Sequence, residues 1–261
     1  MATNAIAVTA NPLNLGYYAR LFSKETKYEF VRLLRTKAFS FSVIGMPVMF
    51  FLLFGVSNRH NGFATYLMPS YSCMGVVSAC LFGIGMGIAL ERSQGWLDLK
   101  QASPMPRLSY IGAKVMSCAG FAVVIVAALV SLGVTVGGAH VTLLQFGELA
   151  GVIVAGSVPF TAMALLVALV VPANSGPGII NLIYLPMSFA SGFWMPISLL
   201  PHFLQKMAPA LPTYHLAQLA LGIFHLAQPG SMMGHWESLG GFTLVMLGAA
   251  WVIFTRSEAK A

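Results

Sequence analysis

Long apolar runs separated by short polar stretches dominate the pattern along the chain. A helix needs about 20 apolar residues to cross a bilayer. The runs do not alternate apolar and polar positions, so they indicate helices and not the strands of a barrel. The second run is long enough to be tilted or to begin with an interfacial turn at Pro69. The pattern predicts an all-α membrane protein with six transmembrane helices, near residues 38–57, 64–90, 111–137, 148–171, 177–195 and 236–255.

The composition agrees with this prediction. Hydrophobic residues make up 57% of the chain and charged residues only 8%, whereas a soluble domain carries about 25% charged residues. So little charge cannot cover a water-facing surface, and lipid must replace water around most of the chain. The three cysteines, Cys73, Cys80 and Cys118, lie inside apolar runs without metal-ligand or disulfide spacing. We expect them to be small buried hydrophobic residues.

The distribution of lysine and arginine predicts the orientation, because cytoplasmic segments of membrane proteins are enriched in both. All of the 14 such residues except Arg59 and Lys206 lie before the first span, between the second and third spans, or after the last. We therefore expect both termini and the 91–110 loop in the cytoplasm of a bacterial inner membrane. The net charge of +7 reflects this bias, and we expect no nucleic-acid partner. The predicted regions are a cytoplasmic N-terminus (1–37), a transmembrane domain (38–255) and a cytoplasmic tail (256–261).

Residues 13–37 have the pattern of a basic amphipathic helix next to a span. Such a helix suits the anionic inner surface of a membrane. The predicted apolar face carries Tyr18, Phe22, Phe30 and Leu33, and the opposite face carries Arg20, Lys24, Lys27 and Arg35.

Five prolines punctuate the segment 196–235, which the predicted topology places outside the cell. Two short helices fit between them, near 198–208 and 213–227, with Thr213 as the N-cap of the second. Apolar helices too short to span a membrane lie in its interface or re-enter it, and a re-entrant helix must keep its backbone polar groups packed against protein.

The segment 91–107, ERSQGWLDLKQASPMPR, is the polar loop on the cytoplasmic side. Gly95 allows a sharp bend, and Trp96, Leu97 and Leu99 are apolar on a short, otherwise polar helix. An exposed aromatic of this kind is suited to docking a soluble partner. A surface loop anchored by an interfacial tryptophan fits the same residues, so both interpretations stand.

The motifs of energy-coupling and catalytic proteins are absent from the sequence. It has no GxxxxGK[ST], HExxH or GxSxG motif. No aspartate, lysine or arginine lies at the centre of a predicted span, where ion-coupled pumps generally need an ionisable group. We expect no catalytic residues, no metal site and no cofactor bound by this chain, and energy supplied by another protein.

In layout the chain resembles the membrane subunits (permeases) of type-2 ABC exporters along nearly its whole length. The most specific stretches are 91–107, followed by Lys114, and 191–222, SGFWMPISLLPHFLQKMAPALPTYHLAQLALG. The resemblance implies that the first stretch couples to an ATPase and that the second forms an extracellular gate. Trp96 and Asp98 depart from the family pattern. The expected coupling residues are Glu91, Arg92, Gly95, Trp96, Leu97, Leu99 and Pro104; the expected gate residues are Ser191, Gly192, Pro196, Pro201 and Pro212.

The resemblance further implies a half-transporter: two permease chains with a dimer of ATPase subunits that bind ATP and magnesium. The substrate would be a hydrophobic or amphiphilic drug, antibiotic or lipid that leaves through the interface of the first, second and fifth spans. Adaptable residues suited to such a path are Met46, Phe50, Met86 and Met187, although contacts with lipid or core explain them equally well. The alternatives are a permease for lipid-linked polysaccharide and, in another class, a non-transporting scaffold or sensor that uses the external histidines.

Overall fold

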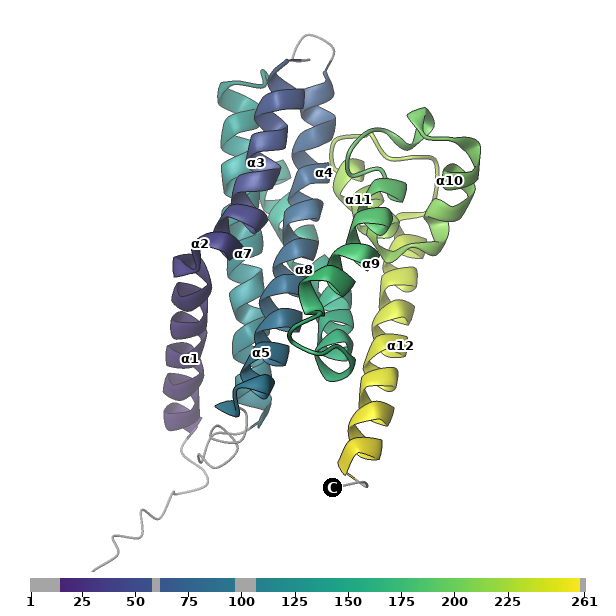
Figure 1. The fold of residues 1–261 in the computed structure, drawn as a ribbon. Helices are drawn as coiled ribbons and strands as arrows, with labels where there is room; N and C mark the ends of the chain where they lie inside the picture. Colours follow the sequence, from purple (N-terminus) through teal and green to yellow (C-terminus); the bar gives the residue numbers. More distant parts are fainter. Residues whose placement is uncertain (1–14, 58–61, 97–106, 259–261) are drawn as a thin grey trace, which may run out of the picture.

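The computed structural model describes residues 15–57, 62–96 and 107–258, and every regular element in them is a helix. The helices form a bundle of long elements with several short helices at one corner (Figure 1). Five helices in the described ranges are long and apolar enough to cross a membrane. The prediction of an all-α, multi-pass membrane protein is therefore confirmed, while the count of six spans stays a prediction.

The first long helix, Lys37–Val56, is continuous but changes its winding. It consists of α2 (Lys37–Ser40), the π-helical η1 (Phe41–Gly45), α3 (Met46–Phe50) and the π-helical η2 (Phe51–Val56). The second consists of α4 (Phe63–Ser78), the π-helical η4 (Ala79–Met86) and α5 (Gly87–Ser93). The other three are α7 (Arg107–Thr135), α8 (Leu143–Val170) and α12 (Met232–Glu258).

The predicted interfacial turn at Pro69 is wrong. Pro69 lies inside α4 and is buried with its neighbours. Helices in lipid tolerate proline where neighbouring groups satisfy the freed backbone. The chain therefore enters the bundle at Phe63 as a helix.

The expected fifth span is shorter than predicted. The helix α9 covers Gly176–Ala190, 15 residues, instead of 177–195. It ends where Gly192 takes a left-handed φ of 82°, a conformation that glycine adopts without steric cost and that commonly closes helices.

The two short helices expected after α9 are shorter and more broken than predicted. The first divides into η5 (Ile197–Leu199), α10 (His202–Met207) and η6 (Ala208–Ala210). Proline has no N–H to donate, and Pro201 and Pro209 interrupt the helix. The second, α11, runs over Pro212–Gly222 with Leu211 at its N-cap. The capping role predicted for Thr213 is therefore wrong.

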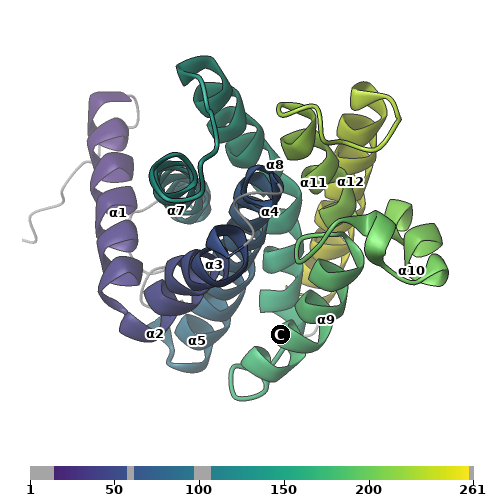
Figure 2. The same cartoon turned by 90° about the horizontal axis from the view of Figure 1, so that it is seen from above.

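The core lies around α4 and η4. All but two of the 16 residues of α4 are buried, and Figure 2 shows this helix in the middle of the bundle, beside α3, α7 and α8. The three cysteines are buried and free, as predicted. By contrast, α12 packs along α8 and α11 at the edge, with large apolar side chains such as Leu244 and Trp251 exposed.

The amphipathic N-terminal helix forms as α1 (Leu15–Arg35) and packs along α7. The ring of Phe30 lies 4.8 Å from that of Phe121, centroid to centroid. Gly112 and Gly120 of α7 leave space for Phe22 and Phe30 respectively. The basic residues predicted for the opposite face of α1 are exposed. The apolar face of this helix is thus used, at least in part, for contact with the bundle.

Gly75 lies at a close approach of α4 to its neighbours. A Cβ atom there would lie 2.9 Å from Ile125 Cγ2 and 3.2 Å from the carbonyl oxygen of Val43. We expect Gly75→Leu to lower the free energy of unfolding by about 1–3 kcal/mol through overpacking. Gly151→Leu is the control, because a Cβ there meets nothing within 4 Å. Thermal unfolding in detergent measures both, and equal melting temperatures would contradict this packing.

Candidate functional site

Charged side chains gather where α1, α5 and α7 meet, at the end of the bundle that also holds the C-terminus of α12 (Figure 1). Each of the three helices contributes at least one charge, so the charges join segments far apart in the sequence. We call Glu29, Arg32, Glu91, Tyr110 and Lys114 the charge cluster.

Lys114 stands at the centre of the charge cluster. Its Nζ donates to Glu29 Oε1 at 2.8 Å and to Glu91 Oε1 at 3.0 Å. Arg32 Nη2 lies 2.6 Å from Glu29 Oε1 and 3.1 Å from Glu91 Oε1, so both carboxylates are shared by two cations. The hydroxyl of Tyr110 donates to Glu91 Oε2, and its ring lies 5.0 Å from Lys114 Nζ.

Burial makes this cluster different from a surface ion pair. The side chain of Lys114 is 2% exposed and those of Glu29 and Glu91 are 7% and 9% exposed. Lys114 was predicted to lie in the loop before the third span, and this prediction is wrong, because the residue lies inside α7. Removing one partner of a buried ion pair costs about 3–5 kcal/mol, because the other charge is left uncompensated. The cluster therefore fixes the three helices to one another.

Arg32 closes the cluster toward solvent, with a side chain 45% exposed. Burial alone lowers the pKa of its guanidinium. The hydrogen bond to Glu29 and the charges of Glu29 and Glu91 outweigh burial, so the pKa of Arg32 is raised. The guanidinium thus stays charged at any physiological pH.

The predicted bend at Gly95 is present. Gly95 has a φ of 73°, and its N–H donates to the carbonyl of Arg92 at 3.2 Å, which closes the end of α5. Arg92 donates to the carbonyls of Leu169 and Val171 at 2.9 and 3.4 Å. These carbonyls end α8, where a cation is favourable. Glu91 and Arg92 therefore connect one helix end to three other helices.

Trp96 follows the bend and is 55% exposed. It borders a groove of about 370 Å³ that is also lined by Glu25, Tyr28 and Arg32 of α1 and by Glu91. The tryptophan, the α1 helix and the charge cluster thus form one surface. The other predicted coupling residues, Leu97, Leu99 and Pro104, lie outside the described residues.

The predicted gate residues lie at the opposite end of the bundle, where hydrogen bonds between neutral groups replace the charges. The hydroxyls of Ser191 and Thr213, both buried, bond to each other. Both oxygens also lie within hydrogen-bond distance of the carbonyl of Met187, at 2.6 and 3.2 Å, and the hydroxyl that does not donate to its neighbour donates there. They link the end of α9 to the start of α11, where Pro212 is the first helical residue.

Tyr66 of α4 joins the same region. Its hydroxyl donates to the carbonyl of Gly192 at 2.6 Å and lies 3.2 Å from that of Met195. Pro196 and Pro201 begin η5 and α10 respectively. The structure therefore brings Ser191, Gly192 and Pro212 together, and the other two prolines shape the chain beside them.

The four residues expected along a substrate path lie in different surroundings. Met46, Phe50 and Met86 are half-buried and Met187 is buried. Phe50 packs on Trp194 with ring centroids 4.9 Å apart, whereas Met86 fits against Gly176, at the other end of α9. Their role stays a prediction.

Two of the predicted external histidines meet. The Nδ1 atoms of His215 and His235 are 2.8 Å apart, and His215 Nε2 lies 2.9 Å from the carbonyl of Pro209. That carbonyl must accept from Nε2, so Nδ1 of His215 accepts from His235. Burial lowers the pKa of His215, which favours this neutral form. Within residues 15–57, 62–96 and 107–258, no three His, Cys, Asp or Glu side chains are grouped as metal ligands.

Comparison with known proteins decides the family. The family model described as "ABC-2 type transporter" matches residues 20–225, which include most of α1, the charge cluster and the gate residues. The chain belongs to the ABC-2 type transporter family. The predicted resemblance is thereby confirmed.

A curated relative from this class of protein agrees. The chain is 26% identical over 217 residues to the protein named "Putative transport permease YvfS" of Bacillus subtilis (strain 168). The match covers 81% of this chain and 87% of the relative. The protein is therefore a transport permease subunit of the ABC-2 family.

Sequence reasoning missed three residues of this ABC-2 protein: Glu29, Tyr110 and Tyr66. Glu29 is an acidic residue among the basic residues of an amphipathic helix, next to Phe30 on its packed side. An acid on the apolar side of a helix indicates a buried partner, and this signal could have found it. Tyr110 and Tyr66 carry no comparable signal in the sequence.

We expect Lys114→Met to lower the free energy of unfolding by about 3–5 kcal/mol, because Glu29 and Glu91 lose their shared cation. The double variant Lys114→Met with Glu29→Gln should lose less than the sum of its single variants, since one uncompensated charge is gone. Thermal unfolding in detergent tests this. Lys27→Met, on the exposed face of α1, is the control. Strict additivity would show that the cluster is not one unit.

Proposed function

We propose that this chain is the membrane subunit of an ATP-driven exporter and that segment 91–110 docks a separate ATPase. The ATPase dimer would bind ATP and magnesium, and this chain would catalyse nothing. Membership in the ABC-2 family supports an ATPase partner. The exposed Trp96, beside a groove formed with α1, supports this end of the bundle as the docking surface.

The observation that carries the proposal is the buried charge cluster. Glu91 lies five residues before Trp96 and is bonded to Lys114 of α7 and to Arg32 of α1. A displacement of the docking segment therefore acts directly on three helices, since separating buried charges is costly. Arg92 extends the connection to the end of α8. A motor bound at Trp96 would thus move the bundle through fixed contacts.

The proposed topology has six spans, with α9 as the fifth and the helices over 197–222 as a re-entrant segment. The start of α1, the end of α5 and the C-terminal end of α12 lie at one end of the bundle, as a cytoplasmic side requires (Figure 1). Lys206 lies in α10, at the opposite end. Thr213 of α11 bonds to Met187 of α9, and Tyr66 of α4 bonds to Gly192 in the turn just before η5. These contacts suit a segment held against protein and away from lipid.

A second permease chain would pack on the first and fifth spans. Both present exposed apolar side chains, among them Leu52 and Leu53 on the first and Leu182 and Leu185 on α9. The contact between Phe50 and Trp194, which follows α9, brings the chain after the end of α9 against the first span. A face shared by these helices would line the path of a hydrophobic or amphiphilic substrate such as a drug, an antibiotic or a lipid.

The alternatives make different demands. A permease for lipid-linked polysaccharide would need a wide aromatic-lined channel between two copies. A scaffold or sensor would need no ATPase, and the contact between His215 and His235 is the feature it would use. A P-loop ATPase in the neighbouring reading frame supports an exporter of either kind over the scaffold.

We expect the double variant Trp96→Ala, Leu97→Ala to reduce co-purification of the ATPase and substrate-stimulated ATP hydrolysis, because an exposed aromatic anchor is lost. Typical hot-spot losses are 2 kcal/mol or more, which corresponds to about 30-fold in affinity. Trp251→Ala, an exposed tryptophan on α12, is the matched control. Undiminished ATPase association in the double variant would rule out this docking surface.

Site-directed labelling tests the orientation. In right-side-out vesicles, His60→Cys should react with a membrane-impermeant maleimide, and Asp98→Cys should react only after the membrane is opened. The native cysteines are buried, so they give little background. The reverse pattern would place the docking segment where no cytoplasmic ATPase reaches it.

A further inference from the structure

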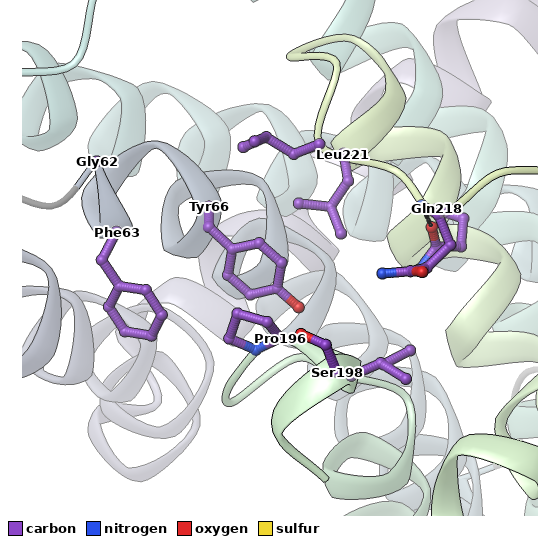
Figure 3. A pocket seen from close by; sticks show the side chains of 10 residues that line it. Gly62, Phe63, Tyr66, Pro196, Ser198, Gln218 and Leu221 are labelled. Carbon is purple, nitrogen blue, oxygen red and sulfur yellow. Dashed lines mark hydrogen bonds between the residues drawn. The ribbon is translucent and has the colours of Figure 1, made fainter.

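A second cavity lies at the end of the bundle opposite the charge cluster. It has a volume of about 300 Å³ and lies between the start of α4, the η5 turn and the end of α11. Figure 3 shows Phe63 and Tyr66 on one side and the amide of Gln218 on another, with Pro196 and Ser198 below. Ligand pockets begin at about 300 Å³, so this one fits a single small group.

Gln218 is the unusual side chain of this cavity. It is 2% exposed, and its Oε1 accepts a hydrogen bond of 2.6 Å from the backbone N–H of Gln228. In the described part of the chain its Nε2 has no recorded acceptor, although it borders the cavity. The arrangement therefore offers hydrogen bonds to an occupant.

Two further polar groups face the same space. The side-chain amide of Gln228 and the hydroxyl of Ser198 both line the cavity. Neither the Gln228 side-chain amide nor the Ser198 hydroxyl is hydrogen-bonded to another residue in the described part of the chain. Together with Gln218 they supply donors and acceptors from three separate segments, η5, α11 and the loop after α11.

Aromatic rings form another wall. The rings of Phe63 and Tyr66 are stacked, with centroids 6.1 Å apart and an angle of 11° between their planes. The hydroxyl of Tyr66 is held by the carbonyls of Gly192 and Met195, which fixes the orientation of its ring. Phe63 is half-buried and so keeps part of its surface available to a ligand.

Charge narrows the class of ligand. Every described residue that lines this cavity is uncharged. A carboxylate, phosphate or ammonium group would thus be taken from water without a counter-charge from the described lining, which is unfavourable. A neutral group with several hydroxyls matches the amides and the Ser198 hydroxyl, while its C–H faces can lie against Phe63.

We propose that this cavity binds a neutral, hydroxyl-rich group, a sugar, either free or as the head group of a lipid. This site goes beyond the proposed function: it lies at the other end of the bundle from the docking surface, and its occupancy requires no ATPase. The open polar groups of Gln218, Gln228 and Ser198 bond the hydroxyls, and Phe63 covers one face of the ring.

Native mass spectrometry of the purified full-length chain tests the site with three probes: a monoglucosyl diacylglycerol, phosphatidylglycerol with matched acyl chains, and free maltose. We expect the glucosyl lipid to bind at least about tenfold more tightly than the anionic lipid. Phe63→Ala and Gln228→Leu should each weaken it by about tenfold, equivalent to 1.4 kcal/mol. Gln228 is exposed, so its substitution preserves the fold. Phe203→Ala, an exposed aromatic of α10 outside the cavity, is the control.

The outcomes distinguish a lipid head group from a free sugar. Binding of the glucosyl lipid alone identifies a lipid head group, and binding of maltose with the same sensitivity to Phe63→Ala identifies a free sugar. Equal binding of phosphatidylglycerol, or glucosyl-lipid binding that neither variant weakens while both keep the wild-type melting temperature, would overturn the proposal. The isolated chain is used, so failure here leaves the ATPase-docking experiment unaffected.

Discussion

The structure depends on one buried ammonium group shared by two carboxylates. Lys114 holds Glu29 and Glu91 at 2.8 and 3.0 Å, almost without contact with solvent. Such buried charges are stable only together, because the attraction between opposite charges offsets the desolvation cost of each. The amphipathic helix α1 is therefore fixed to α7 by charge as well as by the packing of Phe30 on Phe121. Without this interaction, α1 would be held to the bundle mainly by the apolar contacts of its packed face.

The two ends of the bundle are held by different chemistry. Ion pairs bind α1, α5 and α7 at one end. At the other, neutral hydrogen bonds of Thr213 to Ser191 and Met187 join α11 to the end of α9, and Tyr66 of α4 bonds to Gly192. A neutral bond contributes about 0.5–1.5 kcal/mol, far less than breaking a buried ion pair costs. The end beside the proposed docking segment should thus be the more costly to rearrange, and the end with the predicted gate residues and the second cavity the less costly.

Local patterns were predictable and long-range partners were not. Apolar runs predicted the long helices, and the apolar and basic faces of 13–37 predicted α1. The glycine at position 95 predicted the bend that is present there. The ion pairs of Lys114 join residues 85 and 23 positions apart, and a single sequence carries no signal for such pairing. Thr213 shows the opposite failure. A threonine after a proline has the local pattern of an N-cap, yet its hydroxyl bonds Ser191 and Met187 because tertiary contacts override local preference.

One continuous helical segment connects the two ends. The residues from Phe63 to Ser93 carry Tyr66 near one terminus and Glu91 near the other, so a force on the charge cluster acts on the same backbone that holds Gly192. Between them lies η4, eight residues of π-helix buried against α8. Wide helical turns of this kind are frequent at functional sites, and their altered hydrogen bonding can let a helix bend or shift register without unfolding. The segment is therefore bound at one terminus to the charge cluster, while its central π-helix can change its winding. Such a change would reduce the displacement that reaches the end held by neutral hydrogen bonds.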